Sequence, residues 1–531
     1  MAKLRVDGIR VPNPLEVTLA EVNSELITLS RANDPNLLRY IRAEGTLYRN
    51  IPIPTPSAAK SHKSGKPFYP LGLKGGNSES GDPMRQWIDE IEKKVNFWKK
   101  EQIVNLLDAA NFLWNDITQP LRLRVFGRKS SDSSIIERLH SNYQQFPSRA
   151  LAWHPYRHLF AIAHRSDIIY LYDFSRETYI PQALVHKPFM KEITALEWKP
   201  LSGTILAASS QAGICLWRIS IQERPPLEDG ADGTVLAAWL NFLRCEGVEN
   251  YTSLSWHPDG QLLAAGAAGG KVAVWDVVVE RVVELPRLHG EVLNVKWSPS
   301  GEFLCAATSD NALCVFETQS WTMKKVKRKL PSHVKTVCWT PDGSNLLYSL
   351  DGGDKVYILH FLKSQLLEYK EFSPISVAEC DASMTTGKSV KVGGSIHQIA
   401  LDPTGERLAI SFEQSELIAV FMLRPASALT DDANFALHVG FIRGPTWLPT
   451  EQPSPQSSAP QTTASTSIST SPDKDIVVPE PKPYYITFAK QFARGCLLSV
   501  CWENGVVGFV PFYFVSDAQI RERKGDIRGV F

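Results

Sequence analysis

Residues Tyr251–Val277 read YTSLSWHPDGQLLAAGAAGGKVAVWDV, a stretch that predicts three short strands joined by two turns. Apolar and polar residues alternate as far as Trp256, which is the period of a half-buried strand. The sequence His257–Gly260 then ends that strand, because proline lacks a backbone donor and Asp-Gly favours a turn. Gly269 and Gly270 allow the second reversal. One such unit cannot bury both of its faces, so it needs neighbours of its own kind.

The same pattern recurs along the chain as an apolar anchor residue that is followed two positions later by proline. The anchors are Trp153, Trp198, Trp256, Trp297, Trp339, Leu401 and Phe488, and the last of them lacks the proline. They are separated by 45, 58, 41, 42, 62 and 87 residues. The shorter separations match the ~40–45 residues of a WD40 propeller blade, and the longer ones indicate a blade with an insertion. Seven copies predict an all-β, seven-bladed WD40-type β-propeller, whose closure removes exposed strand edges.

A second bulky residue supports the repeat. It follows the anchor by 19 positions in five copies, at Tyr172, Trp217, Trp275, Phe316 and Ile358. The alternative is a two-sheet sandwich in which the tryptophan spacing is accidental. Five tryptophan anchors in one frame, each with a partner at the same distance, favour the propeller.

Composition and charge are those of a globular protein. The chain has 531 residues, of which 43% are hydrophobic and 21% are charged, and its net charge is +1. A charge so close to zero gives no general attraction to nucleic acid or to an anionic membrane. No apolar run is long enough for a membrane-spanning helix, and no secretory signal is visible. The eight cysteines form no Cys-x-x-Cys pair, so we expect free thiols in a reducing compartment.

The residues before the repeats fall into three parts. Residues 1–30 form an arm in which Leu15–Leu29 has strand-like alternation and is a candidate ring-closing strand. Residues 31–82 are interrupted by proline and glycine and predict a linker. Residues 83–145 predict an α-helical segment, because apolar residues recur there at helical spacing.

The helical segment has two interpretations. Its tryptophans Trp87, Trp98 and Trp114 could anchor a protein partner. Alternatively, the helix packs on its own propeller and buries the same three side chains.

The propeller itself is expected over residues 146–515. Two insertions are expected within it, at 220–250, where a short amphipathic helix would fit, and at 362–395. Residues 446–482 contain a run rich in Ser, Thr and Pro and predict a disordered loop inside the last blade region. Residues 516–531 are a polar tail.

Motifs for chemistry are missing from the sequence. Thr386–Ser389 resembles the end of a phosphate loop, but Ala382 stands where the first glycine is required. His154 and His158 are four residues apart, yet Pro155 excludes the helix that would align them on a metal. We therefore expect no catalytic residue, no cofactor and no metal site. A propeller enzyme with its site in the central channel remains an alternative.

The repeats as a set resemble the aladin family of WD-repeat nucleoporins. The resemblance is carried by ALAWHPYRHLFAIA (150–163), ITALEWKPLSGTILAAS (193–209), the 251–277 unit, WSPSGEFLCAAT (297–308), LDPTGERLAIS (401–411) and LLSVCWENGVVGFVPFYFV (497–515). The N-terminal EVTLAEVNSELIT (16–28) is similar to the opening segment of the family. The 497–515 segment is the most specific, because generic WD repeats lack it.

This resemblance implies a non-catalytic scaffold of the nuclear pore complex. It implies anchoring at the nuclear envelope by a transmembrane nucleoporin of the Ndc-one type, support for protein transport, and a spindle role in division. From the net charge and the short apolar runs we expect no direct contact with nucleic acid and no membrane span. The alternative is a soluble WD40 adaptor in another multiprotein complex.

Overall fold

The structure is a computed structural model of the whole chain, in which two compact units are distinguished. The first comprises Met1–Lys63 and Leu139–Phe531, and the second comprises Ser64–Arg138. The described residues all belong to the first unit and are 11–13, 16–22, 24–30, 35–42, 48–54, 146–222, 235–327, 330–362, 368–377, 380–383, 389–423, 436–445 and 480–514.

Six four-stranded antiparallel sheets, here called blades 1 to 6, follow one another along the chain. Blade 1 consists of β4 (Ser148–Trp153), β5 (Leu159–His164), β6 (Ile169–Asp173) and β7 (Thr178–Tyr179). Blade 2 consists of β8 (Ala195–Trp198), β9 (Ile205–Ser209), β10 (Ile214–Gln222) and β11 (Val235–Leu243). Blade 3 consists of β12 (Tyr251–Trp256), β13 (Leu262–Ala267), β14 (Val272–Asp276) and β15 (Arg281–Glu284).

The next three blades repeat this order. Blade 4 consists of β16 (Val292–Trp297), β17 (Phe303–Thr308), β18 (Leu313–Glu317) and β19 (Thr322–Lys327). Blade 5 consists of β20 (Val334–Trp339), β21 (Asn345–Leu350), β22 (Lys355–Leu362) and β23 (Glu368–Ser376). A hairpin of β24 (Cys380–Ser383) and β25 (Ser389–Val392) comes before blade 6, which consists of β26 (Ile396–Leu401), β27 (Arg407–Phe412), β28 (Leu417–Leu423) and β29 (Ala436–Arg443).

Blade 7 joins the two ends of the chain. Its C-terminal strands are β30 (Pro483–Phe488), β31 (Gly495–Trp502) and β32 (Val506–Tyr513). The outer edge of β32 is occupied by N-terminal strands: β1 (Val17–Val22) pairs with it in parallel, and β3 (Ile51–Pro52) pairs with it antiparallel. β2 (Glu25–Leu29) pairs with β1, and the helix α1 (Pro35–Arg42) follows. The N-terminal arm therefore supplies the outer strands of the last blade.

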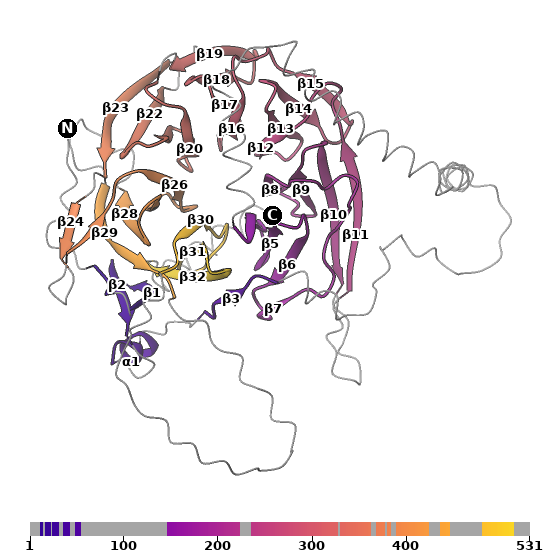
Figure 1. The fold of residues 1–531 in the computed structure, drawn as a ribbon. Coiled ribbons are helices and arrows are strands. Elements are labelled where there is room, and N and C mark those ends of the chain that lie inside the picture. The colour runs from indigo at the N-terminus through magenta and orange to yellow at the C-terminus, as the bar shows by residue number, and fades with distance from the viewer. Residues whose placement is uncertain are drawn as a thin grey trace, which may run out of the picture. The chain divides into compact units, whose positions relative to one another are not determined.

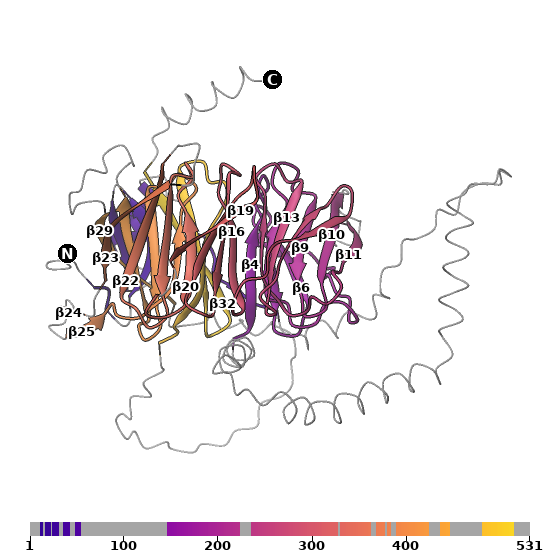
Figure 2. The same ribbon diagram turned by 90° about the horizontal axis from the view of Figure 1, so that it is seen from above.

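The seven blades form a closed ring (Figure 1). The first strand of each blade is the innermost, and each inner strand contacts the next in the order β4, β8, β12, β16, β20, β26 and β30. β30 then contacts β4, so the last blade meets the first. Figure 2 shows the strands running between the two faces of this ring. The seven-bladed propeller expected from the repeats is confirmed.

Strand register explains the constant spacing of the bulky residues. In blade 1, Trp153 lies opposite Phe160 on β5, and Phe160 lies opposite Tyr172 on β6. The anchor and the residue 19 positions later therefore share one partner on the middle strand. Blade 5 differs, because the anchor partner Leu346 pairs with Leu359 and not with Ile358.

The core consists of seven apolar layers between adjacent blades, and each layer holds one anchor. Trp198, for example, packs with Ala161 of blade 1, and Trp256 packs with Leu216 of blade 2. The last layer to close the ring holds Trp153 together with residues of blade 7. Each anchor therefore lies between its own blade and the preceding one.

The arm is held by a buried ion pair. Arg407 of β27 donates from Nη2 to Glu21 Oε1 of β1 at 2.7 Å, and the two side chains are 2% and 0% exposed. Arg443 of β29 donates through its backbone N–H to Thr18 Oγ1 at 3.1 Å and through Nε to the carbonyl of Pro12 at 3.0 Å. Charged groups of blade 6 therefore fix the position of the strand that completes blade 7.

Two of the expected insertions contain blade strands instead. Residues 220–250 do not form a short helix, because 235–243 is β11, the fourth strand of blade 2. Its even-numbered apolar residues Leu236, Leu240 and Phe242 pack on one layer, which is the period of a strand. Within 362–395, Glu368–Ser376 is likewise the fourth strand of blade 5.

The prediction of a linker at 31–82 is wrong for the first part of that range. The helix α1 and the strand β3 both lie there. Ile51 of β3 and Ile53 just after it are buried against blades 1 and 7. Proline at position 52 is tolerated because β3 is a short edge strand. The expected helical segment 83–145 with Trp87, Trp98 and Trp114, most of the loop 446–482, and the tail 516–531 lie outside the described residues.

Candidate functional site

All seven anchors occupy the same place in their blades, the last residue of the inner strand. Six of them are buried, with exposed fractions of 4–7%, and Leu401 is partly buried. The face of the ring at which the inner strands end is here called the anchor face. It carries the turns between the first and second strands and between the third and fourth strands of each blade. Its residues are therefore known from strand direction alone.

Hydrogen bonds tie the anchors to the preceding blade. The indole N–H of Trp198 donates to the carbonyl of Ala152 at 3.0 Å, and that of Trp256 donates to the carbonyl of Glu197 at 3.2 Å. The indole N–H of Trp339 likewise donates to the carbonyl of Lys296 at 3.3 Å. In each case the acceptor directly precedes the anchor of another blade, so the indole groups fix how adjacent blades sit on each other.

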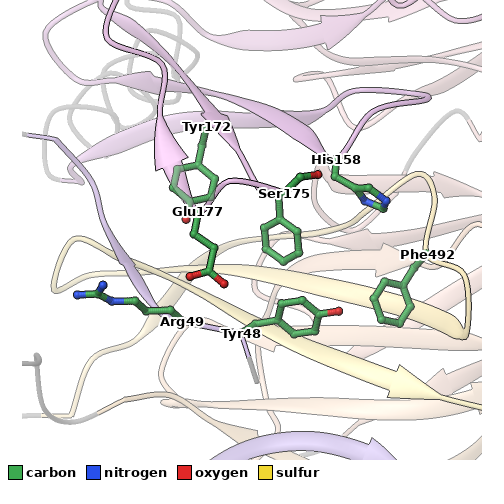
Figure 3. Close-up of a pocket in the computed structure, with 8 residues that line it drawn as sticks. Tyr48, Arg49, His158, Tyr172, Ser175, Glu177 and Phe492 are labelled. Atoms are coloured by element: carbon green, nitrogen blue, oxygen red, sulfur yellow. The ribbon is translucent and has the colours of Figure 1, made fainter. Parts of the chain in front are cut away.

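A pocket of about 270 Å³ opens at the seam between blades 7 and 1 (Figure 3). Its lining comes from the N-terminal segment before β3, the β4–β5 and β6–β7 turns of blade 1, and the β30–β31 turn of blade 7. The lining residues are Tyr48, Arg49, His158, Tyr172, Phe174, Ser175, Glu177 and Phe492. The three turns all belong to the anchor face.

Local hydrogen bonds shape the turn that presents half of this lining. Asp173 ends β6, and its Oδ1 accepts the backbone N–H of Ser175 at 3.0 Å and that of Arg176 at 3.3 Å. An aspartate that caps the backbone in this way favours a tight turn. The backbone N–H of Phe174 donates to the carbonyl of His158 at 2.8 Å, which joins the two turns of blade 1.

Aromatic rings form the floor and one wall of the pocket. Tyr48 stacks on Phe174 with ring centroids 5.0 Å apart, and it meets Phe492 edge-on at 6.3 Å. Phe174 also packs edge-on against Trp153 at 5.5 Å. The pocket is therefore built directly on the anchor of blade 1, and stacked rings give it a firm apolar surface.

Two opposite charges lie at one end of the pocket. Figure 3 shows the Glu177 carboxylate pointing to the side where Arg49 and Tyr48 lie. Burial raises the pKa of Tyr172 to about 12, with Glu177 raising it further and Arg49 opposing that effect. The phenol is therefore neutral at physiological pH, and the two charged groups offset one another at this end.

A second polar group lies at the central channel, near the same turn of blade 7. Glu197 of blade 2 and Lys296 of blade 4 directly precede their anchors, and Lys296 Nζ lies 3.9 Å from Glu197 Oε1. Blades 2 and 4 are not adjacent, so these side chains meet at the channel. Lys490 follows β30 and is reached by solvent. Nearby protein partly shields its ammonium group from water and so lowers its pKa, while Glu197 raises that pKa and Lys296 lowers it.

The chemistry of the pocket is that of binding a side chain. Its volume falls below the ~300–1,000 Å³ of small-molecule sites and suits one large apolar group. In the described part of the chain, no group of three or more His, Cys, Asp or Glu side chains is placed to hold a metal.

Burial raises the pKa of the Cys215 and Cys501 thiols to about 12, so both stay protonated. Among the described residues, no helix is long and apolar enough to cross a membrane.

Sequence reasoning did not find this pocket. Its residues come from positions 48 to 492, and they meet only because the ring closes between blades 7 and 1. The aromatic residues Phe174 and Phe492, which lie in turns of the structure, are a local signal that could have pointed to it. The proposed partner anchors Trp87, Trp98 and Trp114 lie outside the described residues, so the structure does not relate them to the pocket.

The family follows from a comparison of the chain with known protein families. The model described as the Aladin seven-bladed propeller matches residues 132–454, which is more than half of the chain. The chain belongs to the aladin family. This agrees with the resemblance carried by the repeats and with the blade count of the structure.

One relative of this aladin-family chain matches nearly its whole length, and another matches less than a third of it. Aladin from Arabidopsis thaliana is 24% identical over 524 residues, which cover 95% of this chain and 98% of that protein. The WD repeat-containing protein AAC3 of Dictyostelium discoideum is 26% identical over 157 residues, covering 29% of this chain and 30% of that protein. Among solved structures, the Cps50 (Swd1) β-propeller domain of Myceliophteria thermophila is 14% identical, with a TM-score of 0.47 and coverage of 68% and 96%.

Proposed function

We propose that this WD-repeat scaffold protein is a non-catalytic component of the nuclear pore complex. In this proposal a transmembrane nucleoporin of the Ndc-one type holds it at the nuclear envelope, and it supports the transport of proteins between nucleus and cytoplasm. The observation that carries the proposal is the similarity to Arabidopsis aladin over 95% of the chain.

The structure suits a scaffold in two ways. A closed ring with hydrogen-bonded seams is a stiff body that can hold several partners in fixed positions. Its pocket of about 270 Å³ lies between turns of the anchor face and has the size of one large side chain, which suits a surface that binds other proteins.

Imaging of the tagged full-length chain in living cells tests the assignment. A punctate nuclear rim is expected, and depletion of the transmembrane nucleoporin should disperse it into the cytosol. The tag alone serves as the control. A diffuse cytosolic signal in cells whose pores are intact would instead favour the soluble WD40 adaptor. Proximity labelling from the same tagged chain should recover membrane nucleoporins.

A further inference from the structure

Exposed large apolar side chains lie in anchor-face turns of the first three blades. Tyr156 lies in the β4–β5 turn and is 48% exposed, and Leu201 lies in the β8–β9 turn and is 67% exposed. Val278 and Val279 follow β14 and are 73% and 63% exposed. Of these turns, only the β4–β5 turn with Tyr156 also lines the pocket, through His158. An exposed apolar side chain next to a pocket adds apolar area that a protein partner can cover.

The β30–β31 turn carries both a residue that lines the pocket and an exposed lysine. Phe492 lines the pocket, and Lys490, two residues earlier, is exposed. The turn is fixed at its ends, because the N–H of Ala489 donates to the carbonyl of Leu497 at 2.8 Å. The pocket-lining Phe492 and Lys490 therefore stand on one short turn whose ends are joined.

The charges at the channel are unequal. The carboxylate of Glu197 lies 3.9 Å from Lys296 Nζ, and in the part of the chain that the structure describes no carboxylate forms an ion pair with the exposed Lys490. The positive charge of Lys490 is therefore available to a carboxylate from outside the chain. A carboxylate brought by a partner would offset this charge, and charge complementarity of this kind selects partners.

The pocket itself favours an uncharged ring over a cation. Aromatic rings beside a carboxylate can bind an ammonium group. Here, however, Arg49 lines the same pocket as Glu177, so an incoming cation gains no net attraction. An aromatic side chain gains the stacking surface of Tyr48 and Phe492 without that conflict.

We propose that the anchor face at blades 7 and 1 docks a segment of another protein that inserts one aromatic side chain into the pocket and sets an acidic residue against Lys490. Since Lys490 and Phe492 are two residues apart, and each residue of an extended chain spans at most ~3.6 Å, the acidic residue lies within about four positions of the aromatic one. The proposal needs only that the chain is a protein-binding scaffold, and it does not depend on which complex contains it.

Peptide selection on the full-length chain tests this docking site. A random dodecapeptide library displayed on phage is selected on the immobilised protein, and enriched peptides are resynthesised with a fluorophore for anisotropy titration. We expect Phe, Tyr or Trp with Asp or Glu within four positions. Enrichment of Lys or Arg beside the aromatic residue, or no enriched sequence at all, would overturn the proposal.

Matched variants locate the binding. Lys490→Glu is expected to weaken the enriched peptides about tenfold, because it reverses the charge that the acidic residue meets. Phe492→Ala should weaken them at least as much by opening the pocket. Lys191→Glu is the control, since that exposed lysine precedes β8 at the opposite face. Circular dichroism must show that each variant is folded, and affinities unchanged by both Lys490→Glu and Phe492→Ala would refute the site.

The outcomes separate this proposal from the pore assignment. A chain that reaches the nuclear rim while the selection fails would refute the docking site alone. A chain that binds the selected peptides and remains diffuse in the cytosol would refute the pore assignment alone.

Discussion

Trp256 lies at the end of β12 with its indole buried between blades 2 and 3. Only 4% of the side chain is exposed, and its N–H is bonded to the carbonyl of Glu197. Trp239, in contrast, lies on the outer strand β11 and is 49% exposed. The two tryptophans therefore differ in environment while sharing the same chemistry.

This contrast gives the first prediction. Trp256→Ala should lower the free energy of unfolding by about 3–5 kcal/mol, because it leaves a cavity in an interblade layer. Trp239→Ala should change it by less than about 1 kcal/mol, as expected at an exposed position. Urea titration followed by circular dichroism measures both. Equal effects of the two substitutions would contradict the assignment of Trp256 as an anchor.

A buried histidine gives a prediction about pH. His438 on β29 packs against Phe421 and Phe441, and neither ring nitrogen has a hydrogen-bond partner among the described residues. Burial lowers the pKa of His438 to about 4, below the ~6.5 of an unfolded chain. Above pH 6.5 both states are neutral, so the histidine destabilises the fold only as the pH falls from 6.5 through 4.

His438→Phe removes this titration. The loss of stability between pH 7 and pH 5 should shrink by about 2 kcal/mol in the variant. The measurement is urea unfolding at both pH values, with the wild-type chain unfolded in parallel. An unchanged difference between the two pH values would show that His438 is protonated equally in the folded and unfolded states.

At the scale of elements, the inner strands were predictable and several outer strands were not. The anchors and their partners 19 positions later mark strands whose side chains are buried in fixed register, as in Trp153, Phe160 and Tyr172. The outer strand β11 gave no such signal. Its residues Leu236 and Leu240 are four apart, a spacing that fits one face of a helix as well as one face of a strand.

The candidate site could not be predicted from the sequence, for a related reason. A turn such as Phe174–Glu177 has a recognisable sequence, because Asp173 precedes it and caps the backbone. What the sequence does not show is which other turn it meets. Tyr48 contacts both Phe174 and Phe492, and it is held there by the pairing of the nearby strand β3 with β32, which joins positions about 450 residues apart.

At the scale of the whole molecule, the ring is closed by its N-terminal arm. β1 pairs in parallel with β32 through Glu21 and Val22, and the same Glu21 neutralises the buried Arg407 of blade 6. An ion pair so far from water is costly to break, since removing one partner leaves a buried charge. The arm therefore covers the edge of β32 and also supplies the carboxylate that pairs with Arg407.

Removal of the arm should accordingly disrupt the whole ring. A chain that begins at residue 31 lacks β1 and β2, so the edge of β32 is exposed near Phe512 and Arg407 loses its carboxylate. The lost ion pair alone should cost about 3–5 kcal/mol, and the bare edge invites association with other chains. We expect a lower melting temperature and oligomers in size-exclusion chromatography.

A shorter truncation provides the control for this last prediction. A chain that begins at residue 11 keeps β1, β2 and Glu21, so it should remain monomeric with the melting temperature of the full chain. A synthetic peptide of residues 11–30, added to the chain that begins at residue 31, should restore part of the lost stability, because β1 pairs with β32 without needing covalent linkage. If the chain that begins at residue 31 stays monomeric and melts within about 2 °C of the full chain, the ring does not depend on the arm for its closure.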